Sequence, residues 1–416
     1  MTTNETQHRM EWPTEGNHTG HRLGAEELAL LTEVIESGTL NCTYGVMVKR
    51  LEKEFARRCY QSDDAFCIAT PSGTAAIHTA IAGIDPQPGD EIITTPITDM
   101  GALTPIIYQG AVPIFADVEP DSFNISADTI RRVISPRTKA IMPAHLFGAP
   151  CDMEPILELA TQHNLPVIED AAQSPFAEYH GRYAGTLGAI GCFSLQQSKH
   201  MTAGEGGFVI TRDEELARRM VLFHNKGYGY GEPSPDHEFL ALNYRMTELQ
   251  GAVALAQLKK VQAIVARRQE MAARFDESIA ALPGIEPQRV PSNARSAYWK
   301  YTLRVDAARA GADVGQLATY LYENFGIPSS PRYVQKPAFQ CRIFRERRTF
   351  GDSRFPFEGP HRAGLPPVEY RIEEYPGAVD ALANMLVLPW NENFTDEHVA
   401  CMAEALRHAV LHFGGA

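Results

Sequence analysis

The sequence predicts an α/β protein, in which a large domain with a mainly parallel sheet covered by helices precedes a smaller C-terminal α+β domain. Short apolar runs alternate with amphipathic stretches from about residue 65 to residue 211. A long helical pattern rich in Ala and Leu follows, and Pro283-Gly284 ends it. Strands that alternate with helices form parallel sheets whose two faces are both covered.

The segment before the first strand contains an arm and two helices. Residues 1–21 are polar, and we expect 1–25 to form a loose N-terminal arm. Apolar residues at helical spacing then predict a helix over 26–37, which stops at Gly38, and a second helix over 46–59.

The alternating region supplies the sheet. The expected strands are 65–69, 91–95, 112–115, 140–143, 166–169, 190–194 and 207–211. Helices are expected before 84, after Gly101, from Ala127 and from Met153. Right-handed crossovers place the carboxyl ends of parallel strands at one edge of the sheet, where ligands of open α/β sheets bind.

The C-terminal part begins after a long helix. Residues 246–281 predict one long helix or two joined helices. A strand over 298–305 and helices over 314–325 and 396–412 follow. We therefore expect an N-terminal arm at 1–25, a large domain at 26–282 and a small domain at 283–416.

Charge and composition limit the partners. The net charge of −13 argues against a nucleic-acid partner. The seven cysteines form no CxxC pair, which is typical of a reduced chain without a zinc site. Neither a signal peptide nor an apolar run that could cross a bilayer is evident. We expect a cytoplasmic protein with no metal ion and no membrane partner.

Four segments at the expected sheet edge carry groups that could bind a ligand. Ser72-Gly73-Thr74 follows a strand and opens a helix, so it is either an anion site or an ordinary N-cap. Asp170 ends an apolar strand, with Gln173 one turn later. Asp170 could pair with a protonated ring nitrogen of a cofactor, or it could cap a following helix.

A lysine and an asparagine extend this set. Lys199 lies in a loop after a strand, where partial burial would lower its pKa and allow it to form a Schiff base. The alternative is a solvated surface lysine. Ser194, at the end of that strand, could donate to a phosphate, and Asn243 is either a phosphate donor or a helix cap.

The order and spacing of these segments resemble the DegT/StrS family of sugar and cyclitol aminotransferases. The shared motifs are Ser72-Gly73-Thr74, Glu169-Asp170-Ala171-Ala172-Gln173, Ser194 with Lys199 and Gly204-Glu205-Gly206-Gly207, and Asn243-Tyr244-Arg245-Met246. The resemblance extends from about residue 26 to residue 260, and more loosely to the C-terminus. It implies the aspartate-aminotransferase fold, fold type I of the transferases that depend on pyridoxal 5′-phosphate (PLP).

The resemblance also implies a role for each residue. Lys199 would form a Schiff base with PLP and move a proton, and Asp170 would pair with the pyridinium nitrogen. Gln173 would lie near the ring, while Gly73, Thr74 and Ser194 would hold the phosphate. Asn243 would reach the phosphate in a partner subunit, so that a homodimer shares its active sites. An amino acid, often Glu or Gln, would supply nitrogen to a keto-cyclitol or keto-sugar in secondary-metabolite, antibiotic or saccharide biosynthesis.

One position departs from the family pattern. Asp99 stands where relatives place an aromatic residue over the cofactor ring, and a carboxylate cannot stack. Asp99 either faces the substrate or caps the following helix. A PLP-dependent dehydratase or eliminase, and a PLP-binding protein without catalysis, are therefore the alternatives to an aminotransferase. Gln196-Gln197-Ser198-Lys199 favours the cyclitol branch.

The stretch over 342–371 is irregular and rich in arginine. These arginines either bind an anionic group of the substrate or belong to a solvated loop that Glu346, Asp352 and Glu358 partly neutralise.

Overall fold

The computed structural model describes residues 10–414, so the first part of the expected N-terminal arm lies outside the described residues. Seven strands form the main sheet, in the order β3-β2-β4-β5-β8-β9-β1, with two isolated bridges joining β4 to β5. They are β1 (Phe66–Thr70), β2 (Glu91–Thr94), β3 (Val112–Phe115), β4 (Thr138–Met142), β5 (Ile168–Asp170), β8 (Ile190–Ser194) and β9 (Gly207–Thr211). Only β9 runs antiparallel to its neighbours, which confirms the mainly parallel sheet.

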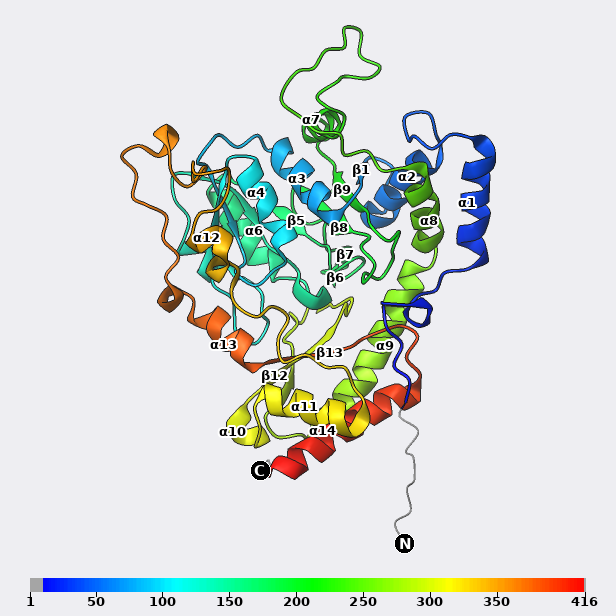
Figure 1. Ribbon diagram of the computed structural model, residues 1–416, viewed down its shortest axis with the longest axis vertical. Helices are drawn as coiled ribbons and strands as arrows, with labels where there is room; N and C mark the ends of the chain where they lie inside the picture. Colours follow the sequence, from blue (N-terminus) through cyan, green and yellow to red (C-terminus); the bar gives the residue numbers. More distant parts are fainter. Residues whose placement is uncertain (1–9, 415–416) are drawn as a thin grey trace.

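Helices cover both faces of this sheet (Figure 1). They are α1 (Ala25–Ser37), α2 (Met47–Tyr60), α3 (Gly73–Gly83), α4 (Thr104–Tyr108), α5 (Ala127–Arg131), α6 (Met153–Gln162), α7 (Glu214–His224) and α8 (Glu248–Leu258). In β9, Val209 packs in the core that contains α3, whereas Phe208 and Ile210 pack in the core that contains α2 and α8. Burial on both faces explains why the strands read as continuous apolar runs.

Helix α7 was not expected from the sequence. The Leu216 N–H donates to Asp213 Oδ1 at 2.9 Å, so Asp213 is the N-cap. Glu214 and Glu215 occupy the first turn, where carboxylates favour the positive end of the helix dipole. These three acidic residues were the available signal.

The long helical pattern forms two helices, α8 and α9 (Val261–Ile279). Helix α9 runs from the larger part of the molecule into the smaller part (Figure 1). Its early residue Val265 packs beside α8, and its later residue Phe275 packs in the C-terminal core. Because one helix serves both cores, the boundary at 282/283 stays a prediction.

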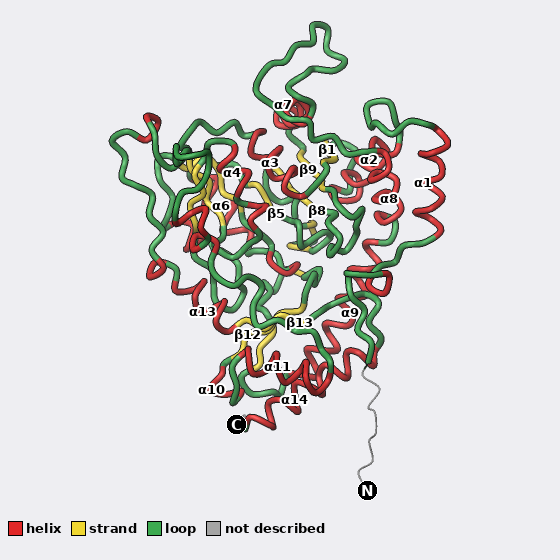
Figure 2. Tube along the Cα trace, in the orientation of Figure 1, coloured by secondary structure: helices red, strands yellow, loops and turns green. Residues whose placement is uncertain are grey.

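The smaller part has its own antiparallel sheet, visible as a separate group of strands in Figure 2. Its order is β10 (Ile285–Pro287), β12 (Tyr301–Val305) and β13 (Met385–Leu388). Helices α10 (Ala307–Ala310), α11 (Val314–Phe325) and α14 (Asp396–Phe413) pack beside it. A third small sheet joins β11 (Ala294–Arg295), β6 (Glu178–Tyr179) and β7 (Arg182–Tyr183).

The segment between α11 and β13 returns to the main sheet. Phe339 packs against Phe115 of β3 with ring centroids 5.8 Å apart, and the Tyr370 hydroxyl donates to the Pro113 carbonyl at 2.6 Å. The segment contains α12 (Arg342–Arg345) and α13 (Pro376–Asn384) between irregular loops. It therefore brings residues from the C-terminal part of the chain to the sheet edge.

Short 3₁₀ helices complete the fold. They are η1 (His18–Gly20), η2 (Met100–Ala102), η3 (Leu146–Gly148), η4 (Ala338–Gln340), η5 (Pro360–Arg362) and η6 (Ile372–Glu374). Within residues 10–414, no helix has both the length and the apolar character that a membrane span requires.

Candidate active site

A cavity of about 440 Å³ lies at the carboxyl edge of the main sheet. Seven of the eight residues that the sequence analysis selected line it: Gly73, Thr74, Asp99, Asp170, Gln173, Ser194 and Lys199. They come from the start of α3, the loop after β2, the end of β5 and the end of β8 with its following loop. The eighth residue, Asn243, lies elsewhere.

The first helical turn of α3 and the end of β8 form one wall of the cavity. The Ala75 N–H donates to Ser72 Oγ at 3.1 Å, so the N-cap alternative for this segment is correct. A Cβ atom on Gly73 would lie 2.9 Å from Ser194 Cβ and 3.0 Å from Ser194 Oγ. Only glycine allows this approach, which places a serine hydroxyl beside the free N–H groups of a helix start. Such a donor set fits a phosphate group.

Asp170 is buried at the end of β5. Its Oδ1 accepts the Ala172 N–H at 3.1 Å, and no helix begins there, so the expectation of a helix cap was wrong. Burial raises the pKa of Asp170, whereas the Ala172 hydrogen bond and the positive charge of Lys199 oppose that rise. A buried carboxylate that lines the cavity can accept a hydrogen bond from a protonated ring nitrogen.

Glu169 points away from the cavity into a closed network. It accepts the Gly185 N–H at 2.8 Å and the Leu187 and Gly188 N–H groups at 2.6 Å. His145 Nε2 lies 2.9 Å from it, while His145 Nδ1 accepts the Cys151 N–H at 3.0 Å. Successive side chains of a strand point to opposite sides. Glu169 therefore stabilises the loop that contains Gly185, Leu187 and Gly188, and Asp170 faces the cavity.

Lys199 lines the cavity from a turn after β8. Its Nζ lies 3.9 Å from the centroid of the Trp299 ring. Burial lowers the pKa of Lys199 to about 8, although the charges of Asp170 and Asp99 oppose that change. Lowering the pKa increases the fraction of free amine near neutral pH, which a Schiff base requires. This position contradicts the alternative of a solvated surface lysine.

Two lining residues, Trp299 and Tyr333, were not expected. Gln173 Oε1 accepts the Phe147 N–H at 2.7 Å, and Gln173 Nε2 donates to the Tyr333 hydroxyl at 3.3 Å. The Tyr333 and Trp299 rings meet edge to face at 5.7 Å. Neither residue belongs to a motif, and both come from the C-terminal part of the chain, so sequence spacing contained no signal for them.

Asp99 caps a short helix, as one of the two alternatives expected, and it lies at the cavity. Its Oδ1 accepts the Gly101 N–H at 2.7 Å and caps η2, while its exposed side chain also lines the cavity. The cap uses Oδ1.

Asp99 could also contact the acceptor, that is, the keto substrate that receives the amino group. In that case Asp99→Ser should keep a cap and lower turnover of the acceptor by about tenfold, the cost of one lost hydrogen bond. The donor half-reaction should keep its rate. Stopped-flow measurement of each half-reaction tests this. Wild-type acceptor kinetics in both Asp99→Ser and Asp99→Ala would leave only the cap role.

Asn243 is exposed and lies outside the cavity of its own chain. It forms an isolated bridge with Asn225, and its Oδ1 accepts the Arg245 N–H at 3.4 Å. The N-cap of α8 is Thr247, so the helix-cap alternative for Asn243 was wrong.

The arginines of the irregular stretch do not line the cavity. Arg342 and Arg348 pair with Glu346, and Arg354 pairs with Glu358. Arg362 is buried and pairs with Glu91. These contacts favour the interpretation as a solvated loop.

Comparison with known proteins gives consistent similarities. The model of the DegT/DnrJ/EryC1/StrS aminotransferase family matches residues 21–358. The spore coat polysaccharide biosynthesis protein SpsC of Bacillus subtilis (strain 168) is 32% identical over 93% of this chain and 95% of its own. GDP-perosamine synthase of Caulobacter vibrioides is 37% identical over 68% of this chain and 76% of its own. The structure of an aminotransferase from Psychrobacter cryohalolentis has a TM-score of 0.82 at 28% identity, covering 98% of this chain and 100% of that one.

Proposed function

Because the chain belongs to the DegT/DnrJ/EryC1/StrS aminotransferase family and is a PLP-dependent aminotransferase of fold type I, we propose that it transfers an amino group from glutamate or glutamine to a keto-sugar. The observation that carries the proposal is the meeting of Lys199, Asp170 and the start of α3 in one cavity. A keto-sugar is preferred because the relatives named above are a polysaccharide biosynthesis protein and a GDP-perosamine synthase. A keto-cyclitol is the second candidate, favoured by Gln196-Gln197-Ser198-Lys199.

The residues around the cavity fit PLP. The N–H groups of Gly73 and Thr74 and the hydroxyl of Ser194 form a cradle for its phosphate. Bound PLP supplies an electron sink for the substrate carbanion. Asp170 keeps a proton on the ring nitrogen, because a nearby opposite charge favours the charged form. Gln173, held by Phe147 and Tyr333, borders the ring space.

Lys199 has two roles. Its amine would hold the cofactor covalently, and once released it would carry a proton to or from the substrate carbon. A pKa lowered to about 8 suits a group that must both take up and release a proton near neutral pH.

The reaction is tested by separate half-reactions. The loaded enzyme should convert to its amino form with glutamate or glutamine, and a keto-sugar should return it. Release of ammonia or water without that conversion would indicate the eliminase alternative, and no change at all would indicate a binding protein. The cytoplasmic location and a role in secondary-metabolite or antibiotic biosynthesis stay predictions.

We also propose a homodimer with shared active sites. Support comes from Asn243, which is exposed and lies outside its own cavity, and from large apolar side chains exposed nearby in sequence, with Leu240 at 96% and Leu242 at 42%. Exposed apolar clusters of this kind commonly mark interfaces.

If the sites are shared, mixing Lys199→Ala with Asn243→Ala protein should recover about a quarter of wild-type activity, because hybrid dimers contain one intact site. Light scattering measures the oligomeric state, and a coupled assay measures the activity. Absence of recovery after verified subunit exchange would contradict a shared site.

A further inference from the structure

The described part of the N-terminal arm docks beside the Lys199 loop. The Gln197 side-chain amide donates to the Glu15 carbonyl at 3.1 Å. Further along, Asn393 Nδ2 donates to the Thr19 carbonyl at 2.8 Å, and Trp12 packs against Phe394 with ring centroids 5.5 Å apart. The arm therefore fixes Glu15 next to the active-site loop.

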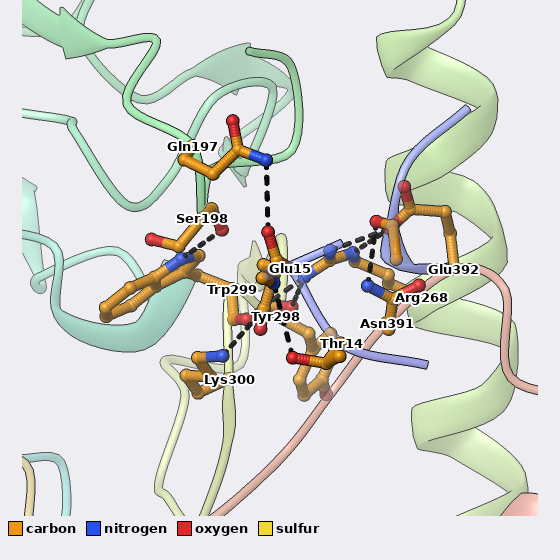
Figure 3. Close-up of polar contacts among 12 residues, drawn as sticks. Thr14, Glu15, Gln197, Ser198, Arg268, Tyr298, Trp299, Lys300, Asn391 and Glu392 are labelled. Atoms are coloured by element: carbon orange, nitrogen blue, oxygen red, sulfur yellow. Dashed lines mark hydrogen bonds and ion pairs between the residues drawn. The ribbon is translucent and has the colours of Figure 1, made fainter. Parts of the chain in front are cut away.

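Trp299 is held firmly between this loop and the C-terminal part (Figure 3). Its indole Nε1 donates to the Ser198 carbonyl at 2.8 Å, and its backbone N–H donates to the Phe147 carbonyl at 2.8 Å. Its own carbonyl accepts from Arg268 at 3.0 Å. Arg268 is buried and paired with Glu392 at 2.7 Å, so the indole ring has little freedom to move.

Two lysine side chains, Lys199 and Lys300, lie over the Trp299 ring. Lys199 Nζ lies 3.9 Å from the ring centroid, and Lys300 Nζ lies 5.5 Å from it. The two charges are therefore within about one Debye length of each other at 0.1 M salt, which is about 10 Å. Lys300 forms an ion pair with Glu15 (Figure 3). By contrast, the lysines that form ion pairs within residues 10–414 are Lys260 and Lys300, and Lys199 forms none.

We propose that Glu15 is a positioning residue that acts on Lys199 through Lys300. It neutralises the second cation at the Trp299 ring and so prevents an uncompensated positive charge from repelling the Lys199 ammonium. The inference rests on the proposed role of Lys199. An indole ring favours any cation placed over it, so the ring alone cannot distinguish the two lysines. The Glu15 carboxylate provides that distinction.

Apart from Glu15 and Lys300, the charged and titratable groups around Lys199 are the same in every variant of the test below. The charges of Asp170, Asp99 and Glu15 oppose the lowering of its pKa, and the charge of Lys300 favours it. Burial holds the pKa of the adjacent His200 well below its usual range, so that ring is neutral. The remaining neighbours at the cavity or the ring are Glu205, Tyr333 and the Arg268–Glu392 pair.

The test measures the pKa of the Lys199 amine directly in the full-length chain freed of cofactor. The rate of labelling by acetic anhydride is followed against pH, and mass spectrometry of the Lys199 peptide isolates the signal. Glu15→Gln should lower the pKa by about half a unit to one unit, which is about a threefold to fivefold gain in free amine at pH 7. Lys300→Met should raise the pKa, and the double variant should return it close to wild type.

The direction of the shift separates charge from structure. If Glu15→Gln acted only by loosening the arm, Lys199 would be less buried, and its pKa would rise rather than fall. Glu286→Gln is the matched control, because it removes a carboxylate from an exposed ion pair with Arg309 on the C-terminal part. It should leave the Lys199 pKa unchanged.

Two outcomes would overturn the inference: an unchanged Lys199 pKa in both single variants, or a rise of the Lys199 pKa in Glu15→Gln. Should Glu15→Gln fail to fold, a rise in Lys300→Met supports the inference and no rise overturns it. Labelling needs no cofactor, so these outcomes differ from failure of the proposed function. That failure would appear as cofactor attached to a lysine other than Lys199.

Discussion

Lys199→Ala is expected to abolish covalent attachment of PLP and to reduce transamination by at least about 10³-fold, because the same amine both binds the cofactor and transfers the proton. The visible absorbance of the bound cofactor should shift to that of free PLP. The structural reason is the position of Lys199 in the cavity that also contains Asp170 and the start of α3.

Lys199→Arg is the matched control, since it keeps the positive charge near Trp299 but cannot bind the cofactor covalently. It should be as inactive as the alanine variant. Borohydride reduction of the wild-type protein, followed by peptide mapping, identifies the modified lysine directly. A pyridoxyl group on any other lysine would refute the central assignment.

Asp170→Asn is expected to retain much of the bound cofactor yet lower turnover by on the order of 10²- to 10³-fold, the usual effect of removing one preorganised electrostatic contact. An amide keeps the size of the side chain but not its charge, so the ring nitrogen loses the anion that favours its protonation. Absorbance titration gives cofactor retention, and a coupled assay gives turnover.

Asp170→Glu separates charge from geometry. It keeps the carboxylate but adds a methylene in a buried position, so it should recover part of the lost rate at some cost in stability. Near-normal turnover of Asp170→Asn would contradict the assigned role.

Local sequence determined most of the elements of this protein. The strands at 112–115, 190–194 and 207–211 and the helix at 314–325 have the bounds that their apolar patterns predicted. Seven of the eight selected residues, all but Asn243, also met at one edge, since parallel strands joined by right-handed crossovers bring their carboxyl ends together. For Lys199 and Asp170, this rule placed two distant positions in one cavity.

Tertiary structure alone decided the rest. Trp299 and Tyr333 reach the cavity because residues beyond 282 fold back onto it, and no local period encodes such a return. Helix α7 depends on packing against α3, for instance Met220 against Gly83, and its acidic cap was too weak a signal. The Glu15–Lys300 pair joins residues 285 positions apart, so only the folded chain brings their charges together beside Lys199. Long-range contacts of this kind depend on the packing of whole elements, which sequence spacing does not describe.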